Sequence, residues 1–259
     1  MDRLIHTALN SLHSARVRQN VSSQNLANAQ VSGYRGDEIG GRFGSVYLTA
    51  DGQMESRVFT RKSEPGLFST KQGELRQTGE QTDLAINGKG YFLVETGEVG
   101  NEKLGMSRRG DFTVSIDGTL INKAGERILD TSLTPIAVPP FRKIFVAENG
   151  QIYIQPMGAE PGVRQLVNQV ALSSGDGLDL VKDTDGLIRP RGGFVREEFN
   201  ADQNATLQQG YIETSNVSVF DELVNNVEIQ KQYQLNVKLI RLAKELDEAG
   251  STLMKLPNG

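Results

Sequence analysis

The residue types that most often carry chemistry are few in this chain and poorly spaced for it. Its two histidines, His6 and His13, stand seven residues apart in an N-terminal segment with helical spacing, and Asp2 is the nearest carboxylate in sequence. A structural zinc site takes about four protein ligands, more than Asp2 can add to the pair. We therefore expect polar or interface histidines and no metal site.

A second candidate is the acidic stretch 176–185, which contains four aspartates. Carboxylates at this density could hold calcium. However, aligning Gly186 with the invariant glycine of an EF-hand loop puts Val181 at the first ligand position and Gly192 where the bidentate glutamate belongs. The pattern predicts a solvated turn in place of an ion site.

Nucleophilic and cofactor chemistry lacks its usual signatures. The chain has no cysteine, which excludes disulfides, thiolate metal sites and a cysteine nucleophile. It also lacks the Gly-x-Ser-x-Gly elbow, the phosphate-binding Gly-x-x-x-x-Gly-Lys loop and the dinucleotide fingerprint. Glu197 and Glu198 are adjacent, so on a strand their carboxylates point to opposite faces. We expect no enzyme, no cofactor and no small-molecule substrate.

Composition narrows the possible partners. At 259 residues with a hydrophobic fraction of 37%, the chain can form a sizeable core as one large or two modest domains. The formal net charge of −4 gives no general attraction to nucleic acid. No segment has the apolar length of a membrane span, and residues 1–30 lack the layout of a cleaved signal peptide. We expect no nucleic-acid partner, no direct membrane span, and no cleaved signal in any export route.

Both ends of the chain have the apolar spacing of helices that pack against partners. Steps of three and four residues keep one helical face turned toward a neighbour. In the N-terminal helix the expected assembly positions are Ile5, Ala8, Leu12, Ala15 and Leu26. In the C-terminal helix the expected assembly positions are Leu223, Val227, Tyr233, Leu235, Val237, Leu239, Ile240, Leu242, Leu246 and Leu253.

The C-terminal helix is apolar on two sides in its middle section. At about 100° per residue, Leu235, Leu239 and Leu242 lie in one stripe, whereas Tyr233 and Val237 lie on roughly the opposite side. A helical hairpin within one molecule covers only one side of each helix, so this pattern favours packing between molecules. The simpler interpretation, a hairpin that buries its stripes within the chain, stays open.

The long middle of the chain has the signals of short antiparallel strands. Asn-Gly and Asp-Gly pairs separate brief apolar alternations, and these pairs suit the tight turns of hairpins. They predict hairpins over 112–121 and 144–154. The expected fold class is α+β, with terminal α-helices forming a coiled-coil-like domain around a central, mainly antiparallel β domain.

Shifts in composition give the expected domain boundaries. Residues 1–30 form the N-terminal helix of an inner assembly domain, and 213–259 form its C-terminal helix, with capping side chains at 214–216. Residues 31–72 form an extended connector, because they contain too many glycines for a helix or a regular strand. Residues 73–212 form the β domain.

Four motifs in order carry a resemblance to a known family. The end of the first helix reads Ser-Gln-Asn-Leu-Ala-Asn-Ala over 23–29, and 32–35 reads Ser-Gly-Tyr-Arg. This resembles the N-terminal signature of the bacterial flagellar rod and hook family, and 82–92, 107–112 and 210–217 resemble its interior and C-terminal motifs. The family-motif residues of the first segment are Asn25, Leu26, Ala27, Asn28, Gly33 and Tyr34.

Within that family, the sequence most resembles the proximal-rod subunits. It implies a structural subunit that polymerises through its terminal helices into a hollow drive shaft that transmits torque. Copies of the chain and other rod proteins would be its partners. It also implies export through the flagellar type III apparatus without a cleaved signal, and a place in the basal body where the rod crosses the periplasm.

Two alternatives stay open beside this interpretation. The stretch 213–217 fits a distal-rod subunit of the same family equally well. The β domain could also be a cell-wall-binding module whose helices serve only to dimerise it. Independently of the family, Asn25 and Asn28 can bond to backbone groups where a helix ends, and Gly33 permits a turn.

Overall fold

The computed structural model describes the backbone of residues 2–40, 43–50, 53–60, 66–97, 104–160, 162–193 and 205–254, and the side chains of 8–40, 66–97, 104–160, 162–193 and 205–252. The chain divides into two compact units. The helix unit consists of residues 1–27, 37–67 and 218–259, and the β unit consists of residues 28–36 and 68–217. The expected α+β class is confirmed.

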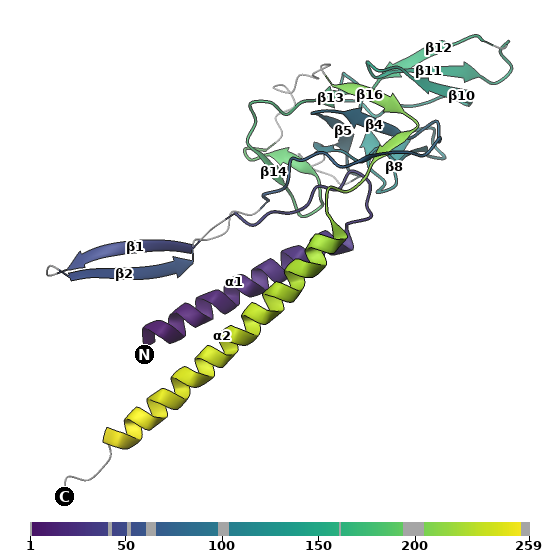
Figure 1. Cartoon of the computed structure of the whole chain (residues 1–259). Helices are drawn as coiled ribbons and strands as arrows, with labels where there is room; N and C mark the ends of the chain where they lie inside the picture. Colours follow the sequence, from purple (N-terminus) through teal and green to yellow (C-terminus); the bar gives the residue numbers. More distant parts are fainter. Residues whose placement is uncertain are drawn as a thin grey trace, which may run out of the picture. The chain divides into compact units, whose positions relative to one another are not determined.

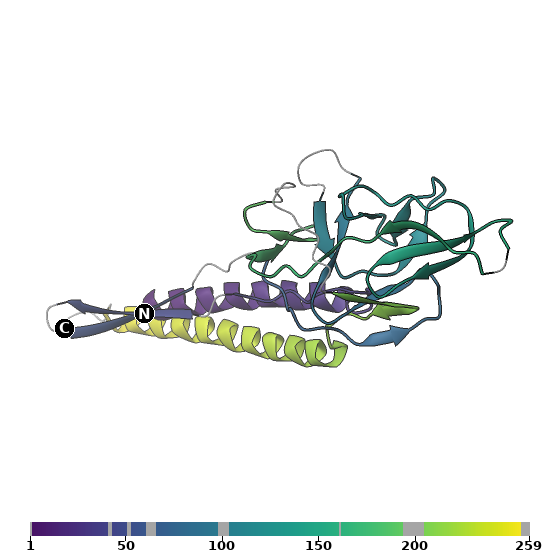
Figure 2. The same cartoon turned by 90° about the horizontal axis from the view of Figure 1, so that it is seen from above.

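The helix unit is built on two long helices, α1 (Asp2–Ala27) and α2 (Val219–Met254). Both views show them side by side and running in opposite directions (Figures 1 and 2). α2 begins after Ser218, whose hydroxyl oxygen accepts a hydrogen bond of 3.3 Å from the N–H of Asp221. The sequence analysis placed the cap at 214–216, whereas the structure places it two residues later, at Ser218. No helix in the described part of the chain is long and apolar enough to cross a membrane.

The helix unit also contains a strand pair that the sequence analysis did not expect. Strands β1 (Phe43–Ala50) and β2 (Gln53–Thr60) pair antiparallel over their full lengths, within the segment expected to be an extended connector. The glycines that suggested a connector lie mostly before β1, and both strands include β-branched and aromatic residues that favour strands. Asp51-Gly52 is the hairpin signal used elsewhere in the chain.

The β unit contains short strands throughout. Their bounds are β3 (Leu75–Gln77), β4 (Leu84–Asn87), β5 (Tyr91–Glu95), β6 (Leu104–Ser107), β7 (Phe112–Val114), β8 (Leu120–Asn122), β9 (Arg127–Ile128), β10 (Phe141–Val146), β11 (Gln151–Pro156), β12 (Gln165–Gln169), β13 (Leu172–Ser173), β14 (Leu180–Lys182), β15 (Ile188–Pro190), β16 (Thr206–Gln209) and β17 (Tyr211–Glu213). All described strand pairs are antiparallel. The largest sheet has the order β14-β15-β6-β5-β9-β8-β7, with β13 also paired to β5.

Both predicted hairpins are confirmed. β7 and β8 pair from Phe112↔Asn122 to Val114↔Leu120, and β10 and β11 pair up to Val146↔Ile152. Gly118 and Gly150 supply the positive φ angles of the two turns, 78° and 86°. The sequence pattern therefore located both turns correctly.

Two buried apolar clusters lie in the β unit, and the larger one forms its main core. Phe92 of β5 and Phe112 of β7 pack edge to face at 5.0 Å between ring centroids. The same cluster includes Leu84 of β4, Ile152 of β11 and Leu207 of β16, so it joins the largest sheet to the smaller ones. The large side chains of this unit are thus mostly buried within the chain itself.

Candidate assembly site

The two helices of the helix unit meet along a seam of small and polar side chains. On α1 the buried positions Ala8, Ala15 and Ser22 stand seven residues apart. On α2 the buried positions Ile229, Asn236 and Ala243 have the same interval. Seven-residue intervals are those of a coiled-coil contact line, but only Ile229 on this line has a large apolar side chain.

Hydrogen bonds cross the seam along most of α1. Asn236 donates to Ser11 Oγ at 2.8 Å, and Asn226 donates to Ser22 Oγ at 3.0 Å. The Ser22 hydroxyl in turn donates to the carboxylate of Glu222. Net gains from such bonds are about 0.5–1.5 kcal/mol each. They specify which residues face each other more than they stabilise the pair.

The large apolar side chains of α2 lie outside the seam. Leu235 and Leu246 are 61% and 55% exposed, and Leu239 and Leu242 between them are also exposed. We call these four residues the leucine flank. At about 100° per residue they lie roughly 80–140° from Ile229 around the helix axis.

A second exposed flank lies on the other side of the seam. Leu223, Val227, Tyr233 and Val237 are all exposed, and we call them the valine flank. Ile240 is half-buried. The seam therefore separates the two apolar flanks, and neither is covered by α1.

The expected positions on α1 are distributed differently. Ala8 and Ala15 are buried in the seam, whereas Leu12 and Leu26 are half-buried. The side chains of Ile5 and Leu253 lie outside the described residues. The structure thus brings two expected alanines into the helix contact and leaves most of the expected C-terminal side chains exposed.

Asn25 of the family motif is buried at the end of α1. Its side-chain oxygen accepts from the N–H of Asp37 at 2.7 Å, and its amide nitrogen donates to the carbonyl of Asp37 at 3.1 Å. The same nitrogen donates to Glu222 at 3.0 Å. Of the other motif residues in this helix, Leu26 is half-buried and Ala27 is exposed. Asn25, at the end of α1, is therefore hydrogen-bonded both to α2 at Glu222 and to the backbone of Asp37.

The remaining motif residues lie in the β unit. Asn28 is half-buried, and its carbonyl accepts from the N–H of Val31 at 3.0 Å. Gly33 has a φ of 65°, and a Cβ there would lie 2.3 Å from the backbone of Arg108, so only glycine fits. The ring of Tyr34 lies 3.8 Å from the ammonium of Lys182.

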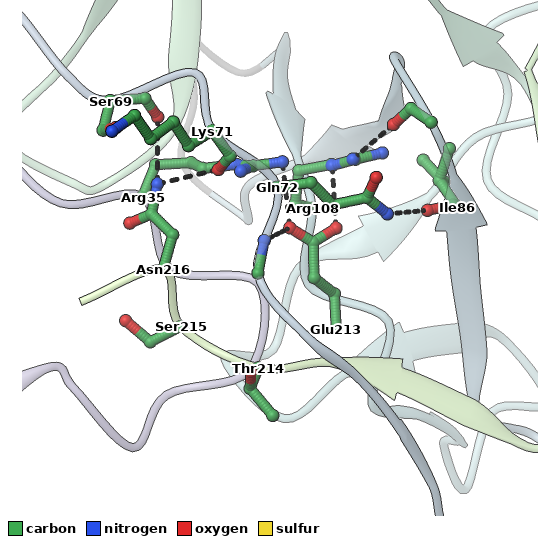
Figure 3. A network of polar contacts seen from close by, with 12 residues as sticks. Arg35, Ser69, Lys71, Gln72, Ile86, Arg108, Glu213, Thr214, Ser215 and Asn216 are labelled. Carbon is green, nitrogen blue, oxygen red and sulfur yellow. Dashed lines mark hydrogen bonds and ion pairs between the residues drawn. The ribbon is translucent and has the colours of Figure 1, made fainter. Parts of the chain in front are cut away.

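A buried charge cluster lies within the β unit (Figure 3). The Glu213 carboxylate lies 2.9 Å from Arg35 and 3.0 Å from Arg108, and these three side chains are at most 3% exposed. Glu213 also accepts from the N–H of Gly73 at 2.9 Å, and Arg108 donates to the carbonyl of Gly88 at 2.6 Å. One carboxylate thus binds chain segments far apart in sequence.

Burial governs the electrostatics of this cluster. Desolvation lowers the pKa of Arg108 to about 10, although nearby Glu213 opposes the shift. Burial likewise raises the pKa of Tyr91, against the effect of Arg35 and Arg108. Arg108 is therefore charged at neutral pH and Tyr91 is neutral, and the Glu213 carboxylate lies against both guanidinium groups.

The acidic stretch 176–185 binds arginines. Arg189 lies 3.0 Å from Asp183 and 2.6 Å from Asp185, and Arg191 lies 2.6 Å from Asp179. In the described part of the chain, no group of three or more acidic or histidine side chains could hold a metal ion. The expectation that this stretch forms a turn agrees with the turn between β14 and β15.

Sequence reasoning missed the α2 side of the seam and the residues of the charge cluster. Ile229, Asn236 and Ala243 are unlike in chemistry, so a search for apolar stripes passes over them, although their seven-residue interval is visible in the sequence. Arg108 and Glu213 lie more than a hundred positions apart. Only the fold brings them together, and no local signal marks the pair.

The chain matches two models of known protein families. Residues 85–154 match the model described as the flagellar hook protein FlgE/F/G D1 domain, which covers much of the β unit. Residues 208–253 match the model described as the flagellar basal body rod FlgEFG protein C-terminal segment, which covers nearly all of α2. Both exposed flanks therefore lie in a segment shared with rod proteins.

Full-length relatives agree with these matches. The chain is 27% identical to the flagellar basal-body rod protein FlgF of Caulobacter vibrioides over 96% of both chains, and 26% identical to FlgF of Salmonella typhimurium over 99% of this chain and 100% of the relative. It is 26% identical to the rod protein FlgG of Buchnera aphidicola over 91% of this chain and 93% of the relative. The chain thus resembles the flagellar basal-body rod proteins over nearly its whole length, and these relatives are structural proteins of the rod and not enzymes.

Proposed function

We propose that the chain polymerises through α1 and α2 into the hollow shaft of the flagellar rod and transmits torque there, in the proximal part of the rod. Flagellar rod proteins assemble with other rod components, and the partners proposed here are copies of this chain and other rod proteins. The observation that carries the proposal is the pair of exposed apolar flanks on α2. Similarity to FlgF proteins over nearly their whole lengths supports the proximal position.

The free energy available at the flanks supports assembly. Burying a fully exposed leucine side chain stabilises by about 1.5–3 kcal/mol. The four leucines of the leucine flank are about half exposed, so each offers roughly half of that free energy. Association costs several kcal/mol of translational and rotational entropy. Contacts along both flanks could exceed this cost, whereas contact through one leucine would not.

The position of the flanks favours a polymer over a dimer. A two-fold dimer uses the same patch on both copies, so a single apolar stripe would suffice for it. α2 instead carries two different patches on opposite sides of the seam. If the leucine flank of one copy packs against the valine flank of the next, the contact repeats from copy to copy and builds a ring or a helical filament.

Export and location follow from the same proposal. The chain would leave the cytoplasm through the flagellar type III export apparatus, without a cleaved signal peptide, and the rod that it builds would cross the periplasm. Passage through a narrow channel requires the helices to separate. A seam of small and polar side chains, with few large apolar contacts, supports easy separation.

The absence of cysteine from the sequence allows a direct test by cross-linking. We would place one cysteine on each flank, Leu242→Cys and Val237→Cys, alone and together, and treat the concentrated full-length chain with a short bismaleimide. The proposal predicts a ladder of multimers for the double variant, and mainly monomer for each single variant. An exposed cysteine in the β unit, Ile116→Cys, controls for random encounter.

The outcomes of this experiment separate the alternatives. Dimers and no larger species from Leu242→Cys alone would indicate a two-fold contact, as expected for helices that only dimerise a binding module. A double variant that stays monomeric, like Ile116→Cys, would contradict polymerisation through these flanks. A ladder from the double variant only would support the head-to-tail contact.

A distal-rod position is the second candidate, favoured by the match to FlgG of Buchnera aphidicola over 91% of this chain. The two positions differ in distance from the inner membrane, which an image of the basal body can measure. A cryo-electron map of purified basal bodies, with this chain's side chains traced, tests both. Density for the chain at the membrane-proximal end would support the first position, and density near the hook would overturn it.

A further inference from the structure

The chain passes between its two units four times. The passages follow residues 27, 36, 67 and 217. Four covalent links carry whatever load passes along the backbone from one unit to the other. Apart from Ala27, which ends α1, the residues on either side of these passages belong to no helix or strand, so contacts outside regular secondary structure must position them.

In the helix unit, hydrogen bonds of Asn25 connect the segments at three of these passages. Its amide bonds in both directions with the backbone of Asp37, and it donates to Glu222 in the first turn of α2. Asn25 itself lies two residues before the first passage, and Asp37 directly follows the second. Glu38 donates from its N–H to the carbonyl of Leu67 at 2.8 Å, which adds the third passage to the group.

In the β unit, Asn216 occupies a matching position. Its side-chain oxygen accepts from the N–H of Gly36 at 2.8 Å, and its amide nitrogen donates to the carbonyls of Ser69 at 3.2 Å and Lys71 at 2.9 Å. Figure 3 shows the bonds to Ser69 and Lys71. The N–H of Asn216 donates to the carbonyl of Tyr34 at 3.2 Å. Asn216 therefore holds the second, third and fourth passages from inside its own unit.

We infer that Asn25 and Asn216 are positioning residues that tie the passing segments together, one in each unit, so that the four backbone links share load. This inference rests on the proposed function, because it gives the two residues a task in transmitting torque. Both residues lie in motifs that the chain shares with rod proteins by resemblance. The structure gives them one chemical task, although they are far apart in sequence.

The chemistry explains why both residues are asparagine. Each must accept from a backbone N–H and donate to a backbone carbonyl at the same time, which a side-chain amide does and a carboxylate does not. Aspartate at position 25 would also place a second carboxylate beside Glu222. Aspartate at position 216 would face the carbonyls of Ser69 and Lys71 without a proton to donate.

Hydrogen exchange on the purified full-length chain tests this inference residue by residue. We would compare Asn25→Asp and Asn216→Asp with two controls, Asn20→Asp on the exposed surface of α1 and Asn149→Asp, whose side-chain oxygen accepts a bond that aspartate also accepts. In both variants the new carboxylate faces backbone carbonyls that it cannot donate to, and at position 25 also the carboxylate of Glu222, so repulsion turns the side chain away from its site. The amide of Asp37 in the first variant and that of Gly36 in the second then lose their acceptor. We expect exchange at each to rise about tenfold, the scale of one lost hydrogen bond.

The amides of strand β5 report on the core and should keep their wild-type exchange in all variants. Exchange at Asp37 and Gly36 within twofold of wild type would overturn the inference. A uniform rise across β5 as well would also overturn it, because it would make the asparagines general stability residues. This readout needs no assembled rod, so its failure is distinct from failure of the cross-linking ladder.

A rescue variant keeps the test decisive if Asn25→Asp folds poorly. Adding Glu222→Gln returns a donor opposite the new carboxylate and removes the like charge. The double variant should recover the contact between the helices. The carboxylate at position 25 still faces the carbonyl of Asp37 and is repelled by it, so it accepts less well from the Asp37 amide, and exchange there stays above wild type. In swimming cells, both aspartate variants should assemble rods yet lose speed in viscous medium, and unchanged speed in both would overturn the inference.

Discussion

The helix unit and the β unit use their apolar residues in opposite ways. In the β unit, large side chains such as Phe92 and Ile128 are fully buried within the chain. In the helix unit, the buried contact line consists mainly of small and polar residues, while the leucines of α2 are exposed. The β unit therefore buries the apolar area that supplies its own folding free energy, whereas the helix unit leaves much of its apolar area exposed.

This difference suits the proposed function, in which the chain is exported, folds and then assembles into the rod. A helix pair with a large apolar seam would hold together in isolation and compete with contacts between copies. Small seam residues let the helices approach, and polar ones fix their register. The flanks then remain free for packing between subunits.

The largest expected effect tests the self-sufficiency of the β unit. Glu213→Ala leaves Arg35 and Arg108 buried without a counter-charge, and removing one partner of a buried ion pair costs about 3–5 kcal/mol. We expect this loss in the free energy of unfolding of the β unit, measured by urea denaturation of the full chain. Asp179→Ala breaks an exposed ion pair with Arg191 and should cost about 0–1 kcal/mol. Equal losses would refute the assigned role of Glu213.

A matched pair of leucine truncations compares the two units directly. Leu172 is 0% exposed in the β unit, and Leu242 is 51% exposed on the leucine flank. Leu172→Ala should destabilise the monomer by about 2–5 kcal/mol, and Leu242→Ala by less than about 0.5 kcal/mol. In the cross-linking assay position 242 carries the cysteine, so the truncation is made at Leu239 of the same flank. There the order should reverse, and Leu239→Ala should weaken the ladder more than Leu172→Ala does. A large monomer effect at Leu242 would show that the flank packs within the chain.

The stability of the β unit at low pH should depend on the carboxyl group of Asp130. Burial acts to raise the pKa of Asp130, but hydrogen bonds from Thr134, Asn168 and Ser132 outweigh it and lower the pKa below the usual value of 3.8. A lowered carboxyl pKa adds stability above the unfolded-state value, and this stability is lost as the pH falls through the folded value. Asp130→Asn should therefore cost about 1–2 kcal/mol at neutral pH and flatten the acid limb of stability.

Glu126 provides the opposite sign in the same unit. Burial raises its pKa, although Asn122 donates a hydrogen bond to its carboxylate. A raised carboxyl pKa gives stability that is full below the unfolded-state value and is lost as the pH rises through the folded value. The free energy of unfolding of wild type should therefore fall as the pH rises toward neutral. Glu126→Gln removes the ionising group, so this fall should be smaller in the variant. Identical pH profiles for wild type and both variants would contradict these assignments.

The smallest expected effect lies in the seam. Asn236→Ala removes the hydrogen bond to Ser11 and should cost about 0.5–1.5 kcal/mol. Circular dichroism of the full chain at rising temperature can follow the loss of helix. A loss of several kcal/mol would mean that the seam holds the helices together firmly, against the contrast drawn between the units.

Local patterns in the sequence predicted the terminal helices and two of the hairpins correctly. The hairpin turns at Gly118 and Gly150 followed from dipeptides that tolerate positive φ angles, and the terminal helices followed from their spacing. The strand pair β1–β2 was missed because glycines near Gly40 outweighed the strand-forming residues that follow. The α2 side of the seam was missed because Asn236 is not apolar and Ala243 is small, and Glu213 was missed because its partners come from distant segments. Contacts of this kind depend on the completed fold.

Hydrogen exchange of the free chain and of the assembled rod tests the central claim most directly. In the free chain we predict strong protection in the core strands of the β unit, and weak protection in α1 and α2, since their flanks lack neighbours. In purified rods the amides of α2 should become as protected as those of β5. Equal protection of α2 in the free chain and in the rod would contradict the claim that the helix unit is completed by neighbouring subunits.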